Sequence, residues 1–200
     1  MKNPVKTTYL PNGVVESSGQ MFQIIIASWG LYGSKVADII GINPSYISIC
    51  FSSQIKITRR NITKICDKFD VSPDTLQEVL NACSKKLTYK QALKLCLDKL
   101  SDASIVERVS SRNEMLRVIR IVQNVEVSEL AEILHLDIST VYAIETNPKK
   151  YKITKNTIYF YAKWLNVSEE TLLGMLEFGK ENPTYGEALS KVLHTLSKGE

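Results

Sequence analysis

The sequence predicts an all-α protein built from two tandem domains. Its strongest signal is an internal repeat, in which residues 34–49 (SKVADIIGINPSYISI) parallel residues 128–143 (SELAEILHLDISTVYA) about 95 residues later. Residues 57–76 match residues 153–172 in the same way. Such a unit exceeds the roughly 20 to 50 residues of a solenoid repeat, so it indicates a duplicated domain. From Gln20 onward, apolar residues recur at helical spacing, and no segment alternates as a strand would.

An irregular arm is expected at residues 1–19, because this stretch contains two prolines and no sustained periodicity. The first domain is then expected at residues 20–100. Its first helix should begin at Gln20, where the apolar residues adopt helical spacing, and end near Gly30.

The next two helices are short and close together. The first of them should begin with Ser34 as its N-cap and end at Gly41, since glycine tolerates the positive φ of a tight turn. The second should run from Pro44 to about Ser52. Proline is favourable in a first helical turn, because the N–H that it lacks would have no partner within the helix there.

Capping residues locate the remaining helices of both copies. In the first copy they are Thr58, Ser72 before Pro73, and Thr88 with Gln91 as a capping box. In the second copy they are Ser128, Thr154, Ser168, and Thr184 with Glu187. We expect a linker at residues 101–111 and the second domain at residues 112–200.

Charge is distributed unevenly along the chain. Residues 21–100 hold 11 Lys/Arg and 6 Asp/Glu, a net +5, whereas residues 101–200 hold 12 and 14, a net −2. The first 20 residues add +1, which gives the total of +4. The positive balance is a mild argument for a polyanionic partner, and local lysine clusters are a stronger one.

Several classes of protein are disfavoured. No apolar run approaches the roughly 20 residues of a transmembrane helix, and the N-terminus lacks the apolar centre of a signal peptide, so we expect a cytoplasmic protein without membrane contact. The four cysteines lack CxxC spacing, and three of them exchange with aliphatic residues between the copies. They are expected to be core thiols, and we expect no metal and no cofactor.

Both copies carry the residues that a helix-turn-helix unit requires. Two short helices cross closely when the first presents a small residue, the turn an aliphatic residue and the second helix a β-branched residue. The first copy supplies Ala37, Ile42 and Ile47, and the second supplies Ala131, Leu136 and Val141.

At these residues the chain resembles the phage-repressor (Cro/CI-like, or XRE) family. The second copy matches better, through LAEILHLDISTVYAIE with Glu145 near the end of its recognition helix, a basic loop, and the closing V-S-x-x-x-L. The first copy has Phe51 in place of that Glu, and Gly33 and Val127 stand where the family usually has glutamine. The resemblance implies two tandem lambda-repressor-like helix-turn-helix domains, of about five to six helices each, that bind double-stranded DNA.

The resemblance also implies which side chains face DNA. Groove-facing candidates that would read bases are Asn43, Pro44, Ser45, Ser48 and Ile49 in the first copy, and Asp137, Ile138, Ser139, Tyr142 and Ala143 in the second. Neither set offers an Arg, Lys or Gln for bidentate base contacts, so short hydroxyls, an amide, apolar groups and DNA shape would carry the specificity.

Phosphate contacts are expected from the loop after each recognition helix and from the start of the next helix. The candidates are Lys56, Thr58, Arg59 and Arg60 in the first copy, and Lys149, Lys150, Lys152, Thr154 and Lys155 in the second.

Three function classes were compared. An enzyme is disfavoured, and no catalytic residue is proposed, because the chain lacks a phosphate-binding loop, HExxH and GxSxG. The favoured interpretation is a bacterial or phage transcriptional regulator, of repressor type, that reads a two-part operator in double-stranded DNA. The alternative is an antirepressor or adaptor that uses one or both domains to grip another protein. Homodimerisation or a regulatory protein partner is compatible with either.

Overall fold

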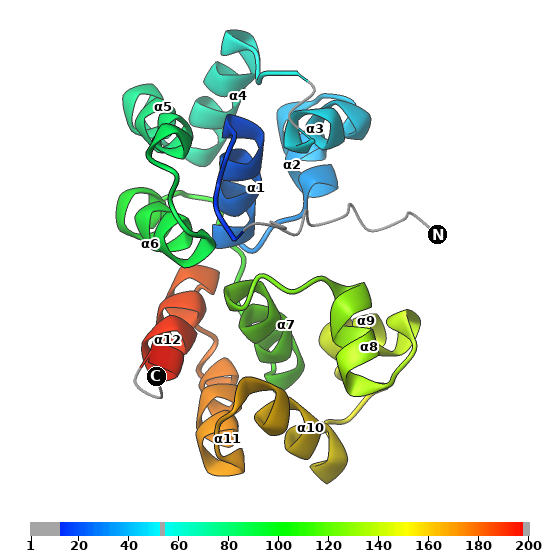
Figure 1. Cartoon of the computed structure of the whole chain (residues 1–200). Helices are drawn as coiled ribbons and strands as arrows, with labels where there is room; N and C mark the ends of the chain where they lie inside the picture. Colours follow the sequence, from blue (N-terminus) through cyan, green and yellow to red (C-terminus); the bar gives the residue numbers. More distant parts are fainter. Residues whose placement is uncertain (1–12, 53–54, 198–200) are drawn as a thin grey trace. The chain divides into compact units, whose positions relative to one another are not determined.

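The computed structural model of the chain describes residues 13–52 and 55–197, and every regular element within them is helical (Figure 1). The prediction of an all-α fold is confirmed. The chain divides into two compact units, unit 1 comprising residues 1–107 and unit 2 comprising residues 108–200. No described helix is both long and apolar enough to cross a membrane.

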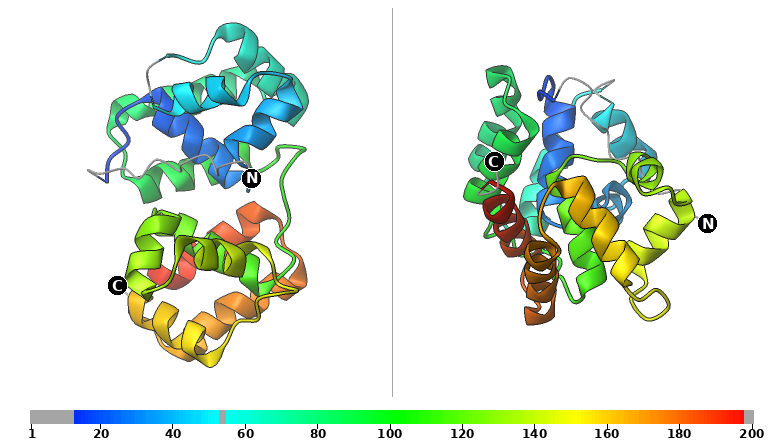
Figure 2. Two further views of the ribbon diagram at one scale, coloured as in Figure 1. Left: turned by 90° about the vertical axis from the view of Figure 1, so that its right-hand side faces the viewer. Right: turned by 60° about the horizontal axis from the view of Figure 1, so that its bottom comes forward.

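Each unit contains six α-helices and one short 3₁₀ helix among its described residues. In unit 1 these are α1 (Ser18–Ser28), α2 (Gly33–Ile40), α3 (Pro44–Phe51), α4 (Arg59–Phe69), α5 (Pro73–Asn81), η1 (Ala82–Lys85) and α6 (Tyr89–Leu100). In unit 2 these are α7 (Arg112–Val122), α8 (Val127–Leu134), α9 (Ile138–Thr146), α10 (Lys155–Leu165), α11 (Glu169–Phe178), η2 (Gly179–Glu181) and α12 (Tyr185–Ser197). Figure 2 gives two further views of these helices.

The first helix of each unit forms the centre of that unit's core. α1 packs against α3, α5 and α6, and its Met21, Phe22 and Ile25 are fully buried. Trp29 follows α1 and stacks on Phe69 of α4, with ring centroids 4.5 Å apart. α7 takes the same place in unit 2, against α9, α11 and α12. Because most residues of both helices are buried, their apolar side chains are stable only when other helices cover them.

Each unit begins with a short extended segment that pairs with the start of its last helix. Val14 forms an isolated β-bridge with Thr88, and Arg108 forms the matching bridge with Thr184. The fully buried Val15 donates its amide to the Leu87 carbonyl at 2.8 Å. Val109 makes the equivalent bond in unit 2, to the Pro183 carbonyl at 2.9 Å. The duplication therefore includes residues that precede the first helix of each unit.

These contacts correct the expected arm and linker. The arm was expected to continue to residue 19, but α1 begins at Ser18 because the Ser17 side chain accepts from the Gln20 amide; residues 1–12 lie outside the described residues. The expected linker, residues 101–111, is divided between the units. Ser104 donates its amide to the Phe69 carbonyl of unit 1 at 2.9 Å, whereas residues 108–111 belong to unit 2.

Most predicted caps are confirmed. In five helices the capping side chain accepts a hydrogen bond from a backbone amide of the first turn; these caps are Thr58, Thr88, Thr154, Ser168 and Thr184. Ser72 stands at the N-cap of α5. Ser34 and Ser128 are not caps, which corrects two predictions. The carbonyls of Tyr32 and Glu126 already accept the first helical bonds of α2 and α8, at 3.1 and 2.9 Å, so both serines lie inside the first turn.

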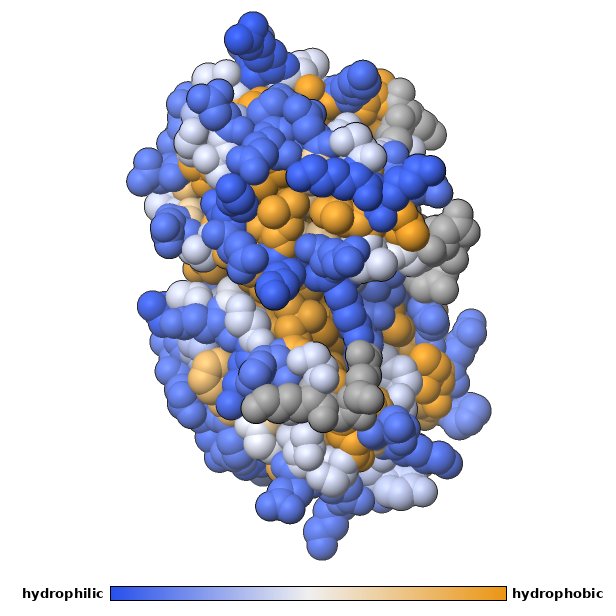
Figure 3. Space-filling view, turned by 60° about the vertical axis from the view of Figure 1, so that its left-hand side comes forward, coloured by the Kyte–Doolittle hydropathy of each residue, from blue (hydrophilic) through white to orange (hydrophobic). Residues whose placement is uncertain are grey.

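The surface is mixed in character. Figure 3 shows a face that is mostly hydrophilic, with apolar residues visible in smaller patches. Large apolar side chains that are at least 38 % exposed include Ile49 on α3, and Ile138 and Tyr142 on α9. Because isolated exposed apolar residues are ordinary, only their grouping on one element is informative.

Candidate nucleic-acid interface

In unit 1, a short turn joins α2 to α3. Gly41 ends α2 with φ +66°, the left-handed conformation that lets the chain reverse direction without a Cβ conflict. Asn43 is the N-cap of α3, and its side-chain oxygen accepts from the Ser45 amide at 2.9 Å. Pro44 occupies the first turn of α3, as the sequence predicted. The start of α3 is thus fixed by its own cap.

Close packing of α3 onto α2 sets which side chains of α3 face outward. Gly33 lies against Ile47 and Phe51, and a Cβ at Gly33 would lie only 2.8 Å from Ile47 Cγ2. Ile47, Cys50 and Phe51 are buried. Tyr46 is half-buried. The five predicted base readers of this copy are all exposed: Asn43, Pro44, Ser45, Ser48 and Ile49.

The basic start of α4 is bonded directly to α3. The Tyr46 hydroxyl on α3 accepts from the Thr58 amide at 3.0 Å and donates to the Lys56 carbonyl at 3.4 Å. Thr58 then caps α4, and Arg59 and Arg60 follow in its exposed first turn. One hydroxyl therefore holds the exposed face of α3 beside a cluster of cations and the free amides of a helix N-terminus. This role of Tyr46 was not predicted, because nothing in the local sequence indicates it.

Unit 2 repeats the short turn with different residues. His135 ends α8 in the left-handed conformation, with φ +54°, where unit 1 has glycine. Asp137 stands at the N-cap of α9, but its carboxylate makes no side-chain cap bond, unlike Asn43 in unit 1. The predicted readers Asp137, Ile138, Ser139 and Tyr142 are exposed, whereas Ala143 is half-buried.

A buried ion pair holds α9 on α7. The Arg120 guanidinium donates from Nε and Nη2 to the two oxygens of Glu145, at 2.7 and 2.9 Å, and both side chains are at most 5 % exposed. Arg120 also donates to the Val125 carbonyl at 3.0 Å. This bidentate geometry partly offsets the cost of burying two charges, and loss of either partner would leave the other uncompensated. The role of Glu145 is thus to anchor its helix.

In unit 1, apolar residues take the place of this ion pair in the packing between the first and third helices. At the positions of Arg120 and Glu145 unit 1 has Ile26 and Phe51, both buried, and the Phe51 ring lies 5.7 Å from the Phe22 ring. The joint exchange of both partners between the copies is a sequence signal from which the pair could have been predicted.

The loop after α9 carries the lysines of unit 2. Thr154 lies nine residues after Glu145, whereas Thr58 lies only seven after Phe51, so this loop is longer. The Asn113 side-chain amide fixes it from inside, because it donates to the Ile144 and Tyr151 carbonyls at 2.6 and 2.9 Å. All the predicted phosphate-contact residues of this copy are exposed: Lys149, Lys150, Lys152, Thr154 and Lys155.

The surface formed by α2 and α3 in unit 1 differs sharply in charge from the surface formed by α8 and α9 in unit 2. Residues 121–148, which include α8 and α9, contain five acidic residues and no Lys or Arg. The matching stretch of unit 1, residues 27–52, contains only Lys35 and Asp38. A phosphate backbone approaching α8 and α9 would meet the exposed carboxylates of Glu132 and Asp137, whereas one approaching α2 and α3 would meet the opposite charges of Lys35 and Asp38.

No described group of three or more His, Cys, Asp or Glu residues could hold a metal ion. Cys50, Cys66 and Cys96 are buried, and burial raises the pKa of each of these thiols. They lie in the core as small apolar residues do. Comparison of the chain with protein-family models, with curated proteins and with solved structures finds no match.

Proposed function

We propose that this chain is a sequence-specific regulator of transcription that binds double-stranded DNA, of the bacterial or phage repressor type. In this proposal the helix pairs α2–α3 and α8–α9 are the helix-turn-helix motifs of two lambda-repressor-like domains. Unit 1 and unit 2 together read a two-part operator. Unit 1 supplies most of the binding energy.

The observation that carries the proposal is the link between α3 and α4 in unit 1. The Tyr46 hydroxyl bonds to the backbone of Lys56 and Thr58, so exposed α3 side chains and exposed cations are held on adjoining elements. A helix that enters a major groove needs flanking phosphate contacts to fix its position, and we infer that Arg59 and Arg60 provide them.

The exposed side chains of α3 suit a limited kind of readout. The Asn43 side-chain oxygen is used in capping, which leaves its amide group to donate to a base acceptor. Ser45 can donate or accept, and Ile49 can pack on a thymine methyl. Few bidentate contacts are possible, so specificity would depend in part on the deformability of the DNA sequence.

Unit 2 contributes phosphate contacts from its lysine loop, while the carboxylates on α8 and α9 weaken its approach to DNA. A second candidate function for this unit is binding of another protein. It is favoured by the exposed apolar side chains of Ile138 and Tyr142, which are 56 % and 42 % exposed.

Selection from a pool of randomised DNA duplexes with the full chain tests the proposal. A recurrent motif should be enriched, and the enriched duplex should bind at least about 10³-fold more tightly than the unselected pool at physiological salt. Failure to enrich any motif, with only uniform weak binding, would refute sequence-specific recognition.

A further inference from the structure

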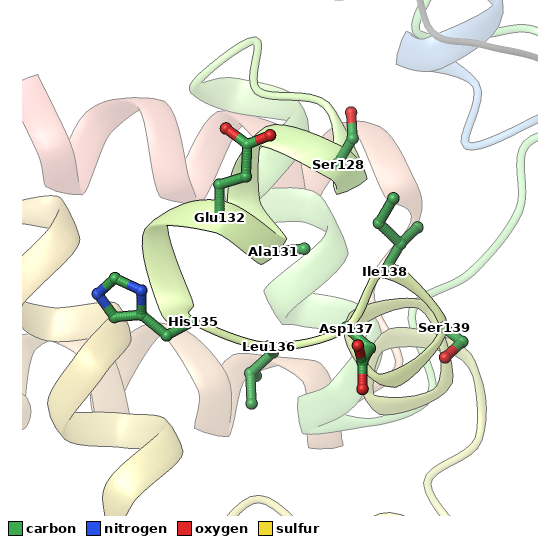
Figure 4. A pocket seen from close by; sticks show the side chains of 8 residues that line it. All are labelled: Ser128, Ala131, Glu132, His135, Leu136, Asp137, Ile138 and Ser139. Carbon is green, nitrogen blue, oxygen red and sulfur yellow. The ribbon is translucent and has the colours of Figure 1, made fainter.

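An open groove runs along unit 2 between α8, the turn and the first residues of α9 (Figure 4). Its volume is about 730 Å³. The lining residues are Ser128, Ala131, Glu132, His135, Leu136, Asp137, Ile138 and Ser139.

The groove combines exposed apolar surface with acidic groups. Leu136 and Ile138 are 40 % and 56 % exposed, while Ala131 is buried in the same lining. Within the described part of the chain, the carboxylates of Glu132 and Asp137 take part in no ion pair. Apolar area that stays in water beside unpaired carboxylates is suited to a partner that is both apolar and cationic.

Unit 1 lacks this combination at the matching positions. Asp38 remains, but Asn43 replaces the second acid and Pro44 replaces the most exposed isoleucine. The difference concerns the surface, because the helices and the turn are the same length in both units up to that point. The groove of unit 2 therefore carries a chemistry that the shared architecture does not require.

We propose that this groove binds a basic amphipathic helical segment of a partner protein. Apolar side chains of the segment cover Leu136 and Ile138, and its lysines or arginines lie beside Glu132 and Asp137. Helices commonly dock in this way, with an apolar stripe in a groove and charges at its rim. The inference deepens the second candidate function of unit 2 and does not depend on DNA binding by unit 1.

Two synthetic helical peptides of about 16 residues, or roughly 24 Å, provide the probes. Both carry the same leucine stripe, and their polar faces are either all lysine or all glutamate. Anisotropy titrations with the full chain at physiological salt should show at least about tenfold tighter binding of the lysine peptide. Equal binding of both peptides, or no binding of the lysine peptide, would overturn the proposal.

Variants of the groove locate the peptide. Glu132→Lys combined with Asp137→Asn should weaken binding of the lysine peptide by at least about tenfold, since the attraction becomes partial repulsion. Asn preserves the cap position and is the residue that unit 1 has there. The control, Asp38→Lys at the matching position of unit 1, changes the net charge by +2 against +3 and should leave peptide affinity within about twofold, because Asp38 does not line the groove. Equal losses in both variants would mean non-specific charge attraction.

Ile138→Ser distinguishes other occupants of the groove. It should weaken binding of the lysine peptide by at least about tenfold. Arg59→Ala with Arg60→Ala should weaken affinity for the selected DNA duplex and leave affinity for the lysine peptide unchanged. Loss of DNA affinity in Ile138→Ser without loss of peptide binding would assign the groove to DNA. Sedimentation as a dimer that Ile138→Ser converts to a monomer would assign it to a second copy of the chain. Either result would overturn the proposal.

Discussion

Arg59 and Arg60 lie at the exposed start of α4, where the helix N-terminus adds its own free amides. Each phosphate that a protein neutralises contributes about −0.9 to the slope of log affinity against log salt concentration. Changing both residues to alanine should therefore make the slope shallower by about two units and weaken binding to all DNA sequences alike.

Titrations over a series of salt concentrations measure this slope. Lys68→Ala with Lys94→Ala is the matched control, because it removes the same charge from exposed positions outside this cluster. An unchanged slope in the arginine variant, or an equal change in the control, would remove these arginines from the interface.

The Arg120–Glu145 pair gives a prediction about stability. Arg120→Ile or Glu145→Phe alone should destabilise unit 2 by about 3 to 5 kcal/mol, because each leaves a buried charge without its partner. The double variant, which installs the residue types of unit 1, should recover most of that loss.

Urea unfolding of the four proteins completes a double-mutant cycle. A double variant destabilised by the sum of both single effects would show that the two side chains act independently, contrary to their bidentate contact in the structure.

The ion pair also marks a limit of prediction from sequence. Glu145 was correctly placed near the end of its helix, but its burial depends on Arg120, 25 residues away. Likewise, the link from Tyr46 to the start of α4 spans a loop whose course is set by tertiary packing. The family resemblance predicted the candidate readers, and all of them except the half-buried Ala143 are exposed, because the buried stripe of a helix fixes its opposite face.

Tyr46 offers a test of how α3 and α4 are coupled. Tyr46→Phe removes the hydroxyl that accepts from the Thr58 amide, so that amide should exchange with solvent faster and DNA affinity should fall by about threefold to tenfold. Hydrogen exchange and anisotropy titrations measure the two effects. Tyr159→Phe, at an exposed tyrosine of unit 2, is the control. Unchanged exchange at Thr58 would contradict the coupling.

The capping boxes of α6 and α12 give a matched comparison of pH dependence. The Thr184 backbone amide and hydroxyl donate to the Glu187 carboxylate and lower its pKa from the ordinary 4.5, whereas unit 1 uses an uncharged Gln91. A lowered folded-state pKa means that this stabilisation is present above pH 4.5 and is lost as pH falls through the folded value.

Acidification should therefore weaken the α12 cap and leave the α6 cap unaffected. Glu187→Gln should reduce the acid sensitivity of urea unfolding of unit 2, while Gln91→Glu should introduce such sensitivity in unit 1. The same acid response in the wild type and Glu187→Gln would contradict this account.

Helix starts were predictable where the signal is local. Thr58, Thr88 and Thr154 cap their helices because a hydroxyl reaches an amide only three residues ahead. Ser34 and Ser128 carry the same signal but lie inside their helices. The starts of α2 and α8 are set by the path of the chain after the preceding helix, and that path depends on how the helices pack.

Across the whole chain, duplication was the most reliable guide. It predicted two related halves, because the apolar positions of a repeat must fill equivalent cores, whereas the all-α class was predicted from the helical spacing of the apolar residues. The boundary between the halves was harder to predict, because the segment around it bonds to Phe69 and Pro183, which are distant in sequence. The charge of each half was visible from sequence, but the surface that carries each charge depends on the fold.

We propose that the exposed face of α3 in unit 1 makes the main contact with DNA. Ser45 and Ser139 occupy the same exposed position in the first turns of α3 and α9. A glutamate there is compatible with either helix, because negative charge near a helix N-terminus is favourable. The two substitutions therefore place one carboxylate on each face without disturbing the fold.

Affinity for the selected duplex should be measured for Ser45→Glu and Ser139→Glu at one salt concentration, with urea unfolding as a check on folding. Ser45→Glu should weaken binding by at least about tenfold through repulsion from the DNA, and Ser139→Glu by clearly less. Undiminished binding by a folded Ser45→Glu variant, or a larger loss in Ser139→Glu, would contradict the assignment of DNA contact to unit 1.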